Sequence, residues 1–170
     1  MLVWSKKYSI GIPRLDADHV MLVSLLNQLH INLAEDMSGE AIGPILDALQ
    51  HYADGHFIIE ESMMTDCGYP GLAGHRERHD GFCIEMARLC LKHRARLDVA
   101  RSLRALLNTW LFDHVVRADG QFGAWLRANR VSIPPGASSG PDVRRPVRTP
   151  ATAATATATA TASDRRFAPA

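Results

Sequence analysis

Four stretches of about 20 residues, in which apolar side chains recur at helical spacing, are the strongest constraint on the fold of this chain. Strand signals are nearly absent, and glycine, proline or serine separates the stretches. The expected helices run from Asp16, a candidate N-cap, to about Met37, from Glu40 to just before Gly68, from 72 to 93, and from 98 toward His114, with a short helical piece at 122–128. Short connections between long amphipathic helices make sequential helices antiparallel. The pattern therefore predicts an all-α fold, an antiparallel up-down four-helix bundle.

The two ends of the chain differ from this central region. Residues 1–14 are expected to form an extended N-terminal arm, because Gly11 and Pro13 would interrupt any helix that began earlier. From residue 132 onward, proline, glycine, serine and alanine dominate and lead into an alanine-threonine repeat, which offers few side chains large enough for a core. We therefore expect one domain over residues 1–131 and a low-complexity, disordered C-terminal tail over residues 132–170.

Composition restricts the partners of the chain. The net charge of +1 divides into +3 for residues 134–170 (five Arg against two Asp) and −2 for residues 1–133, so no basic face for nucleic acid is expected. The longest charge-poor run, 20–34, is too short to span a membrane, and no apolar signal segment follows Lys6 and Lys7. Three cysteines without a CxxC pair argue against a disulfide framework. We expect a cytoplasmic monomer with no nucleic-acid or membrane partner.

Histidines and carboxylates fall on all four expected helices, on or beside the apolar faces. In chain order they are His19, the i,i+4 pair His56 and Glu60, the i,i+4 pair His75 and His79, and His114 followed by Asp119. Each fragment alone is more often an ordinary core or helix-surface feature, which is the interpretation we keep for His30, His51 and His93. Together they predict a metal site, because bundles build such sites from inward-facing side chains on facing helices.

The types of ligand restrict the metal. Five imidazoles and two carboxylates without a thiolate suit iron, manganese, copper or zinc, and seven side chains are too many for one ion. If Glu60, Asp119 and one solvent-derived oxygen bridge two ions, three histidines complete six-coordination at one ion. The remaining two histidines leave the other ion with one open position. On a regular α-helix, His114 and Asp119 would point about 140° apart, so the spacing also predicts a π-type turn between His114 and Gly120.

Four motifs follow one another along the chain. They are Trp4 with Asp16-Ala-Asp-His19, then His56-Phe-Ile-Ile-Glu60-Glu61, then Gly68-Tyr69-Pro70 followed by His75 and His79, and finally Trp110-Leu-Phe-Asp-His114-Val-Val-Arg-Ala-Asp119. In this order and spacing they resemble the motifs of the hemerythrin family in its single-domain bacterial form. The resemblance covers about residues 4–128 and fills all seven ligand positions. Asp18 departs from it, because the family usually has glutamine there. A carboxylate at this position could reach the metal region or stabilise the helix N-terminus through the helix dipole, and we favour the second role.

The resemblance assigns a role to each ligand. It implies two iron ions with a bridging oxo or hydroxo group, with His75, His79 and His114 on the saturated iron. His19 and His56 would hold the iron with the open position, and Glu60 and Asp119 would bridge the two irons. It also implies an apolar oxygen pocket, although ordinary bundle core is an equally good interpretation of the same residues, Phe57, Trp110, Leu111 and Val115.

The expected function is reversible binding of molecular oxygen by a carrier, store or delivery protein that is not an enzyme. Known di-iron oxygenase and ferroxidase bundles carry two ExxH motifs, and here Glu60-Glu61 is followed by Ser62-Met63-Met64. The alternatives are an oxygen or redox sensor, a di-iron enzyme that handles peroxide or nitric oxide, and a bundle with structural zinc or no metal.

Overall fold

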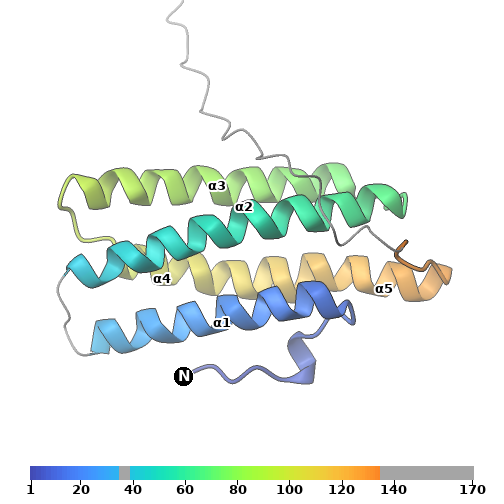
Figure 1. Ribbon diagram of the computed structural model, residues 1–170, viewed down its shortest axis with the longest axis horizontal. Coiled ribbons are helices and arrows are strands. Elements are labelled where there is room, and N and C mark those ends of the chain that lie inside the picture. The colour runs from blue at the N-terminus through green and yellow to red at the C-terminus, as the bar shows by residue number, and fades with distance from the viewer. Residues whose placement is uncertain (35–38, 135–170) are drawn as a thin grey trace, which may run out of the picture.

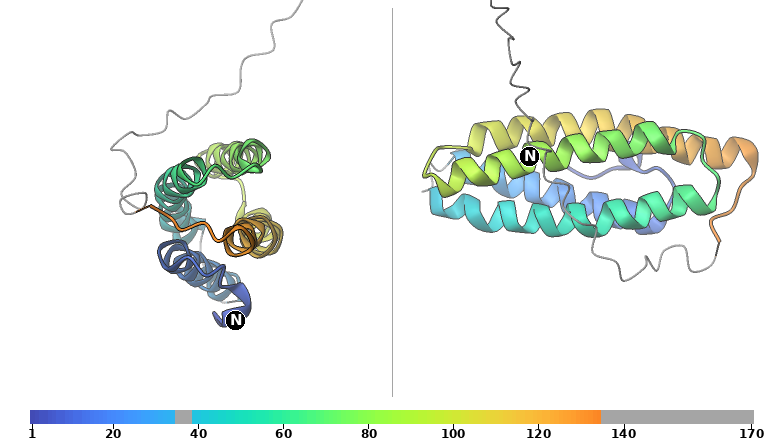
Figure 2. Two further views of the ribbon diagram at one scale, coloured as in Figure 1. Left: turned by 90° about the vertical axis from the view of Figure 1, so that its right-hand side faces the viewer. Right: turned by 90° about the horizontal axis from the view of Figure 1, so that it is seen from above.

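The computed structural model describes residues 1–34 and 39–134, and its helices form an antiparallel up-down four-helix bundle (Figure 1). The chain runs through α1 (Pro13–Ala34), α2 (Gly43–Asp66) and α3 (Leu72–Arg94), and then through α4 (Ala100–Thr109) and α5 (Gly120–Asn129), which lie along one line. Three of the rods of the bundle are α1, α2 and α3, and the fourth is the line formed by α4 and α5. Seen end-on, the rods surround one interior (Figure 2). The predicted fold class is confirmed. The expected tail from residue 135 onward lies outside the described residues.

The first helix begins three residues earlier than expected. Pro13 is its first residue, a position where proline loses no hydrogen bond, so Asp16 is not the N-cap. The Asp16 carboxylate lies in the first turn and accepts hydrogen bonds from the backbone N–H of Ile10 at 2.8 Å and the hydroxyl of Ser9 at 2.7 Å. It thus holds the arm against the helix start. The expected end near Met37 lies outside the described residues.

The second and third helices agree closely with the periodicity. A 3-10 turn, Gly39–Ile42, leads into α2, which begins at Gly43, three residues after the expected Glu40, and has Pro44 in its first turn. The chain leaves α2 through Gly68, whose φ of +66° is a backbone conformation that glycine adopts without strain. The third helix is one residue longer than predicted.

The fourth rod contains a long irregular segment. Between α4 and α5, residues Trp110–Asp119 form a π-helix, and helical backbone angles at both junctions make residues 100–129 one continuous rod. The predicted irregularity before Gly120 is therefore confirmed, although it begins four residues before His114. The expected helical piece after Gly120 is also confirmed as α5.

Two apolar clusters fill the bundle and leave a polar layer between them. The larger contains side chains of α1, α2, α3, α4 and the π-helix, and the smaller joins the end of the arm to α1, α2 and α5. Along α1, His19 falls between Leu15 of the smaller cluster and Leu22 of the larger one. On the last rod, Asp119 falls between Val115 and Phe122 in the same way. The candidate site is therefore enclosed by apolar packing toward both ends of the bundle.

The N-terminal arm is extended apart from one 3-10 turn, Lys6–Tyr8. Asn27 of α1 fixes it by two hydrogen bonds of 2.7 Å, one from the backbone N–H of Leu2 and one to its carbonyl oxygen. Further along, the Ile10 carbonyl lies so close to Gly123 of α5 that a Cβ atom there would clash with it. Within residues 1–34 and 39–134, no helix combines the length and apolar character needed to cross a bilayer.

Candidate metal centre

The structure brings all seven predicted ligand side chains together inside the bundle. None is more than 4% exposed, although imidazoles and carboxylates of this kind are rarely buried unless they are paired or bound. Each helical rod contributes at least one of them, namely His19 from α1, His56 and Glu60 from α2, His75 and His79 from α3, and His114 and Asp119 from the π-helix.

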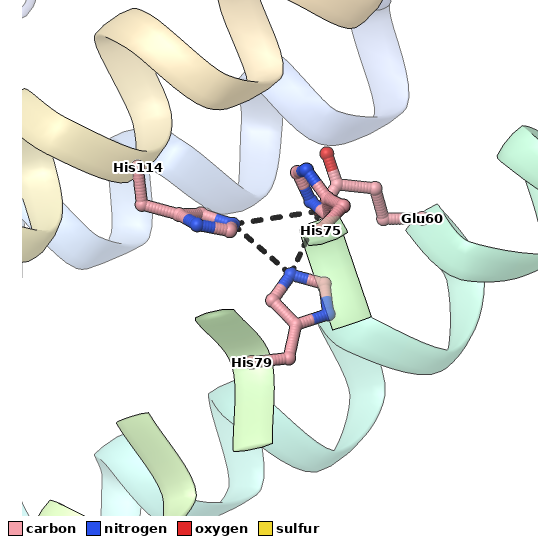
Figure 3. A group of neighbouring side chains, drawn as sticks. All are labelled: Glu60, His75, His79 and His114. Atoms are coloured by element: carbon pink, nitrogen blue, oxygen red, sulfur yellow. Dashed lines mark hydrogen bonds and ion pairs between the residues drawn. The ribbon is translucent and has the colours of Figure 1, made fainter. Parts of the chain in front are cut away.

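The seven residues fall into two groups, within each of which the candidate ligand atoms lie within 4.8 Å of one another. The four-ligand group comprises Glu60, His75, His79 and His114, whose side chains converge from α2, α3 and the π-helix (Figure 3). In it, Nε2 of His79 lies 3.0 Å from Nε2 of His114 and 3.2 Å from Oε2 of Glu60. Nε2 of His75 lies 3.0 Å from the same oxygen. Three imidazole nitrogens thus surround one carboxylate.

The three-ligand group comprises His19, His56 and Asp119. Its aspartate faces both groups, because Oδ2 lies 3.1 Å from Nε2 of His19 and Oδ1 lies 3.1 Å from Nε2 of His114. Glu60 reaches the other way, and its Oε2 lies 3.8 Å from Nε2 of His56. The two carboxylates therefore occupy the boundary between the groups, as bridging ligands would.

The π-helix explains how His114 and Asp119 meet. Hydrogen bonds from residue i to i+5 place residues five apart one turn above each other, whereas a regular α-helix would turn them away. Each rod thus directs its donors inward, and the fourth does so at the cost of regular helical geometry.

Hydrogen bonds within the protein do not satisfy all of the buried ligand atoms in this layer. Although they approach one another closely, several form no hydrogen bond with any described residue, namely both ring nitrogens of His19, Nε2 of His56, Oε1 of Glu60, Nδ1 of His114 and both oxygens of Asp119. Buried polar atoms without partners are uncommon in folded proteins. Imidazole nitrogens and carboxylate oxygens are the donors that first-row transition metals accept, so the chemistry of the set fits metal ions.

Burial keeps two of the imidazoles, those of His19 and His114, ready to act as ligands. Burial lowers the pKa of His19 to about 4 and that of His114 to about 3, so both are neutral near pH 7, as metal binding requires. Burial raises the pKa of Glu60, but hydrogen bonds from His114, His75 and His79 outweigh it and hold that pKa well below the usual value. Burial and the neighbouring Glu60 charge raise the pKa of Asp119 well above its usual value. The metal-free layer thus carries one carboxylate that resists ionisation.

The four expected pocket residues lie in the larger apolar cluster, beside the ligands. Phe57 stacks on the ring of His79 at 3.8 Å between centroids, and Trp110 stacks on His114 at 3.7 Å. Leu111 and Val115, which flank His114 in the π-helix, are completely buried. Large apolar side chains therefore cover the four-ligand group.

Sequence reasoning missed or misjudged three neighbours of the site. Tyr52, one helical turn before His56, stacks on that ring at 5.0 Å, and its spacing on α2 could have indicated this. Asp18 does not act on the helix N-terminus alone, since its carboxylate lies 3.3 Å from Nδ1 of His56, a correction of our expectation. Glu61 accepts a hydrogen bond from Nδ1 of His79 at 2.7 Å, a contact that its position beside Glu60 did not reveal.

Comparison with known proteins agrees with this geometry. Residues 10–126 match the model of the hemerythrin HHE cation-binding domain. A bacteriohemerythrin of Stenotrophomonas maltophilia is 36% identical over 121 residues, which are 71% of this chain and 78% of that protein. One from Pseudomonas aeruginosa is 31% identical over the same shares of both chains, and one from Methylococcus capsulatus is 28% identical over 132 residues, 75% of this chain and 98% of its own. The resemblance found in the motifs is thereby confirmed, and the chain belongs to the hemerythrin family.

Proposed function

We propose that this protein binds molecular oxygen reversibly at two iron ions held by the seven buried side chains. The observation that carries the proposal is the inequality of the two groups. Counting both carboxylates as shared, the four-ligand group offers five protein ligands and the three-ligand group offers four. One solvent-derived bridging oxygen would bring the ions to six and five ligands, so a single position is left for a small ligand.

The division of roles follows from the distances. His75, His79 and His114 would hold the ion without a vacancy, and His19 and His56 would hold the ion with one. Asp119 would bridge the two ions, since its two oxygens face different groups, and Glu60, whose Oε2 lies near histidines of both groups, would bridge them from α2. The iron pair supplies the electrons that reversible oxygen binding needs. The protein would hold the ligands in place and keeps His19 and His114 neutral near pH 7.

The apolar covering is part of the proposed function. Phe57, Trp110, Leu111 and Val115 are buried beside the four-ligand group, where they would hinder water and ions from entering the metal layer and so help to protect a reversible complex from irreversible oxidation. A ligand set of five imidazoles and two carboxylates also differs from the glutamate-rich sites of di-iron oxygenases. We therefore favour a carrier, store or delivery protein, acting as a cytoplasmic monomer, over a sensor or an enzyme that handles peroxide or nitric oxide.

The decisive experiment is anaerobic reconstitution with ferrous iron, followed by metal analysis and visible spectroscopy. We expect two irons per chain, a nearly colourless reduced protein, a coloured form in air, and return to the colourless form when oxygen is removed. Fewer than two irons would reject the metal assignment. Continuous consumption of oxygen without a reversible spectrum, or rapid turnover of peroxide or nitric oxide, would reject the carrier in favour of an enzyme.

A further inference from the structure

Two carboxylates outside the seven ligands contact the metal layer from its outer side. Glu61 of α2 accepts a hydrogen bond from Nδ1 of His79 on α3 through Oε1, at 2.7 Å. Its other oxygen, Oε2, lies 3.0 Å from Nε of Arg76, a half-exposed residue of α3. A chain of charge-assisted contacts thus runs from the surface through Glu61 to a buried imidazole of the four-ligand group.

A similar chain reaches the three-ligand group. Asp18 of α1 lies with Oδ2 3.3 Å from Nδ1 of His56 on α2, and its Oδ1 lies 3.8 Å from Nη2 of half-exposed Arg14. Both distances are longer than those around Glu61. The two groups therefore have the same arrangement, in which a half-exposed arginine contacts a partly buried carboxylate, and this carboxylate contacts a buried histidine of the next helix. The contacts are shorter on the four-ligand side.

This arrangement has a chemical consequence for the histidines. A carboxylate that accepts the proton of Nδ1 fixes the tautomer whose Nε2 lone pair is free, and it makes that nitrogen a stronger donor. The Nε2 atoms of His79 and His56 are the ones that belong to the metal groups, since both approach Oε2 of Glu60. By contrast, the Nδ1 atoms of His19 and His114 are buried without a hydrogen-bond partner among the described residues. Each group thus contains one supported and at least one unsupported histidine.

The same contacts shift the pKa values of Asp18 and His79. Burial raises the pKa of Asp18, but the hydrogen bond and charge of His56 outweigh it and hold that pKa below its ordinary value. Burial lowers the pKa of His79, and hydrogen bonds to Glu60 and Glu61 more than compensate.

We propose that Glu61 and Asp18 are positioning residues, one for each metal ion, which orient His79 and His56 and strengthen their donation, with Glu61 the stronger of the two. The inference rests on the proposed function, because it needs the two irons. It also predicts an order of iron loss. The ion of the three-ligand group, with fewer ligands and a looser support, leaves first.

The test compares iron release to a chelator and the reduction potential of the iron pair in wild-type protein and four variants. Glu61→Ala should release iron roughly 10- to 100-fold faster, the usual effect of removing a carboxylate behind a metal-bound histidine. Glu61→Gln keeps an acceptor without the charge, so it should retain iron nearly as wild type while its potential rises, because weaker donation favours the ferrous state. Asp18→Ala should accelerate mainly the loss of the first iron, by a smaller factor, and Asp18→Asn should restore most of the retention.

Glu85→Ala is the matched control, because Glu85 is an exposed carboxylate of α3 that pairs with Arg88 at 2.8 Å, and it should change neither measurement. Helix content by circular dichroism of the metal-free variants separates misfolding from loss of support, and the glutamine and asparagine variants keep the test informative if an alanine variant unfolds. Release rates and potentials equal to wild type in Glu61→Ala, Glu61→Gln and Asp18→Ala would overturn the inference while leaving the metal assignment intact. A wild-type protein that binds no iron would instead reject the proposed function.

Discussion

The two ligand groups are built from the same kinds of side chain, yet their surroundings differ. In the four-ligand group, aromatic rings stack on His79 and His114 at 3.8 and 3.7 Å, and Glu61 contacts His79 at 2.7 Å. In the three-ligand group, the nearest stacked ring lies 5.0 Å from His56, and the outer carboxylate lies 3.3 Å away. The four-ligand group is thus closely packed, whereas the three-ligand group has longer contacts and one ligand fewer.

The difference originates in how many donors each helix supplies. On α3, His75 and His79 are four residues apart, so both face the interior of the bundle one turn apart. On α1, His19 stands alone, and the ring of Trp4 from the arm lies 6.2 Å from it. A vacancy in a bundle site therefore needs no special loop, because a helix with one ligand opposite a helix with two is enough to produce it.

Substitution of Glu60 should have the largest effect, because it affects both ligand groups at once. Its carboxylate lies within 3.2 Å of His75 and His79 and reaches His56 at 3.8 Å, so it serves both groups. Glu60→Gln keeps the shape but removes the charge that two neighbouring cations require. We expect the iron content to fall from two per chain to none, as measured by metal analysis after reconstitution. A variant that keeps one iron would show that the groups assemble independently.

His56→Ala and His79→Ala should separate the two groups. His56→Ala should retain about one iron per chain and lose oxygen binding, because the group with the vacancy is left with His19 and the carboxylates. His79→Ala removes one ligand from the four-ligand group. It should cause iron loss from both groups, because the shared carboxylates Glu60 and Asp119 are then held less firmly on the four-ligand side. His51→Ala on α2 is the control, because that exposed ring contacts only its own helix in the described structure. Equal loss in both variants would contradict the inequality.

The fold was largely predictable from periodicity, and the reason shows in α3. Its apolar spacing, its HxxxH pair and the break at Gly71 act locally, and its observed end differs from the expected one by a single residue. The start of α1 was wrong by three residues because Asp16 interacts with the arm that precedes the helix, and this arm could not be placed from local sequence. Local rules predict elements well and the packing of an arm poorly.

The candidate ligands were also visible in the sequence, whereas their outer contacts were not. The His114 and Asp119 spacing even indicated the π-helix, although not its start at Trp110. The contact of Asp18 with His56 spans 38 positions and depends on how α1 is rotated against α2. Such rotations follow from core packing across helices, and the sequence pattern of one helix does not determine them.

Both groups should respond to acid in the metal-free protein through one histidine each. With pKa values of about 4 and about 3, His19 and His114 stay neutral in the folded chain, whereas they gain a proton near pH 6.5 when unfolded. Each therefore makes the free energy of unfolding fall as the pH drops from 6.5 toward 4. Asp119 has the opposite effect on the free energy of unfolding. Its raised pKa makes the folded state hold a proton that the unfolded state releases above pH 3.8.

Each of the two neutral histidines lowers the free energy of unfolding by up to about 1.4 kcal/mol per pH unit below pH 6.5, and Asp119 offsets part of their sum, so the metal-free protein is expected to be less stable at pH 4.5 than at pH 6.5. His79 acts in the opposite direction near pH 6.5, because its raised pKa lets the folded state hold more of this proton than the unfolded state does. Urea denaturation of the metal-free protein at pH 6.5 and pH 4.5 measures this difference in the free energy of unfolding. Equal stability at pH 4.5 and 6.5 would show that the two imidazoles are not neutral in the fold. His19→Leu should reduce the dependence, because the contribution of His114 then stands alone against the opposite contribution of Asp119.

The smallest expected effect concerns Tyr52, the ring beside the looser group. Its hydroxyl is buried and has no hydrogen-bond partner among the described residues, while its ring is stacked on His56. Tyr52→Phe keeps the stacking and removes the unsatisfied hydroxyl, so thermal denaturation of the metal-free protein should show stabilisation by about 1 kcal/mol. Tyr69→Phe, at a half-buried position, should change stability less. If Tyr52→Phe instead destabilises the protein or lowers iron retention, the hydroxyl contributes to the three-ligand group. The properties of that group would then depend on Tyr52 as well as on its smaller number of ligands.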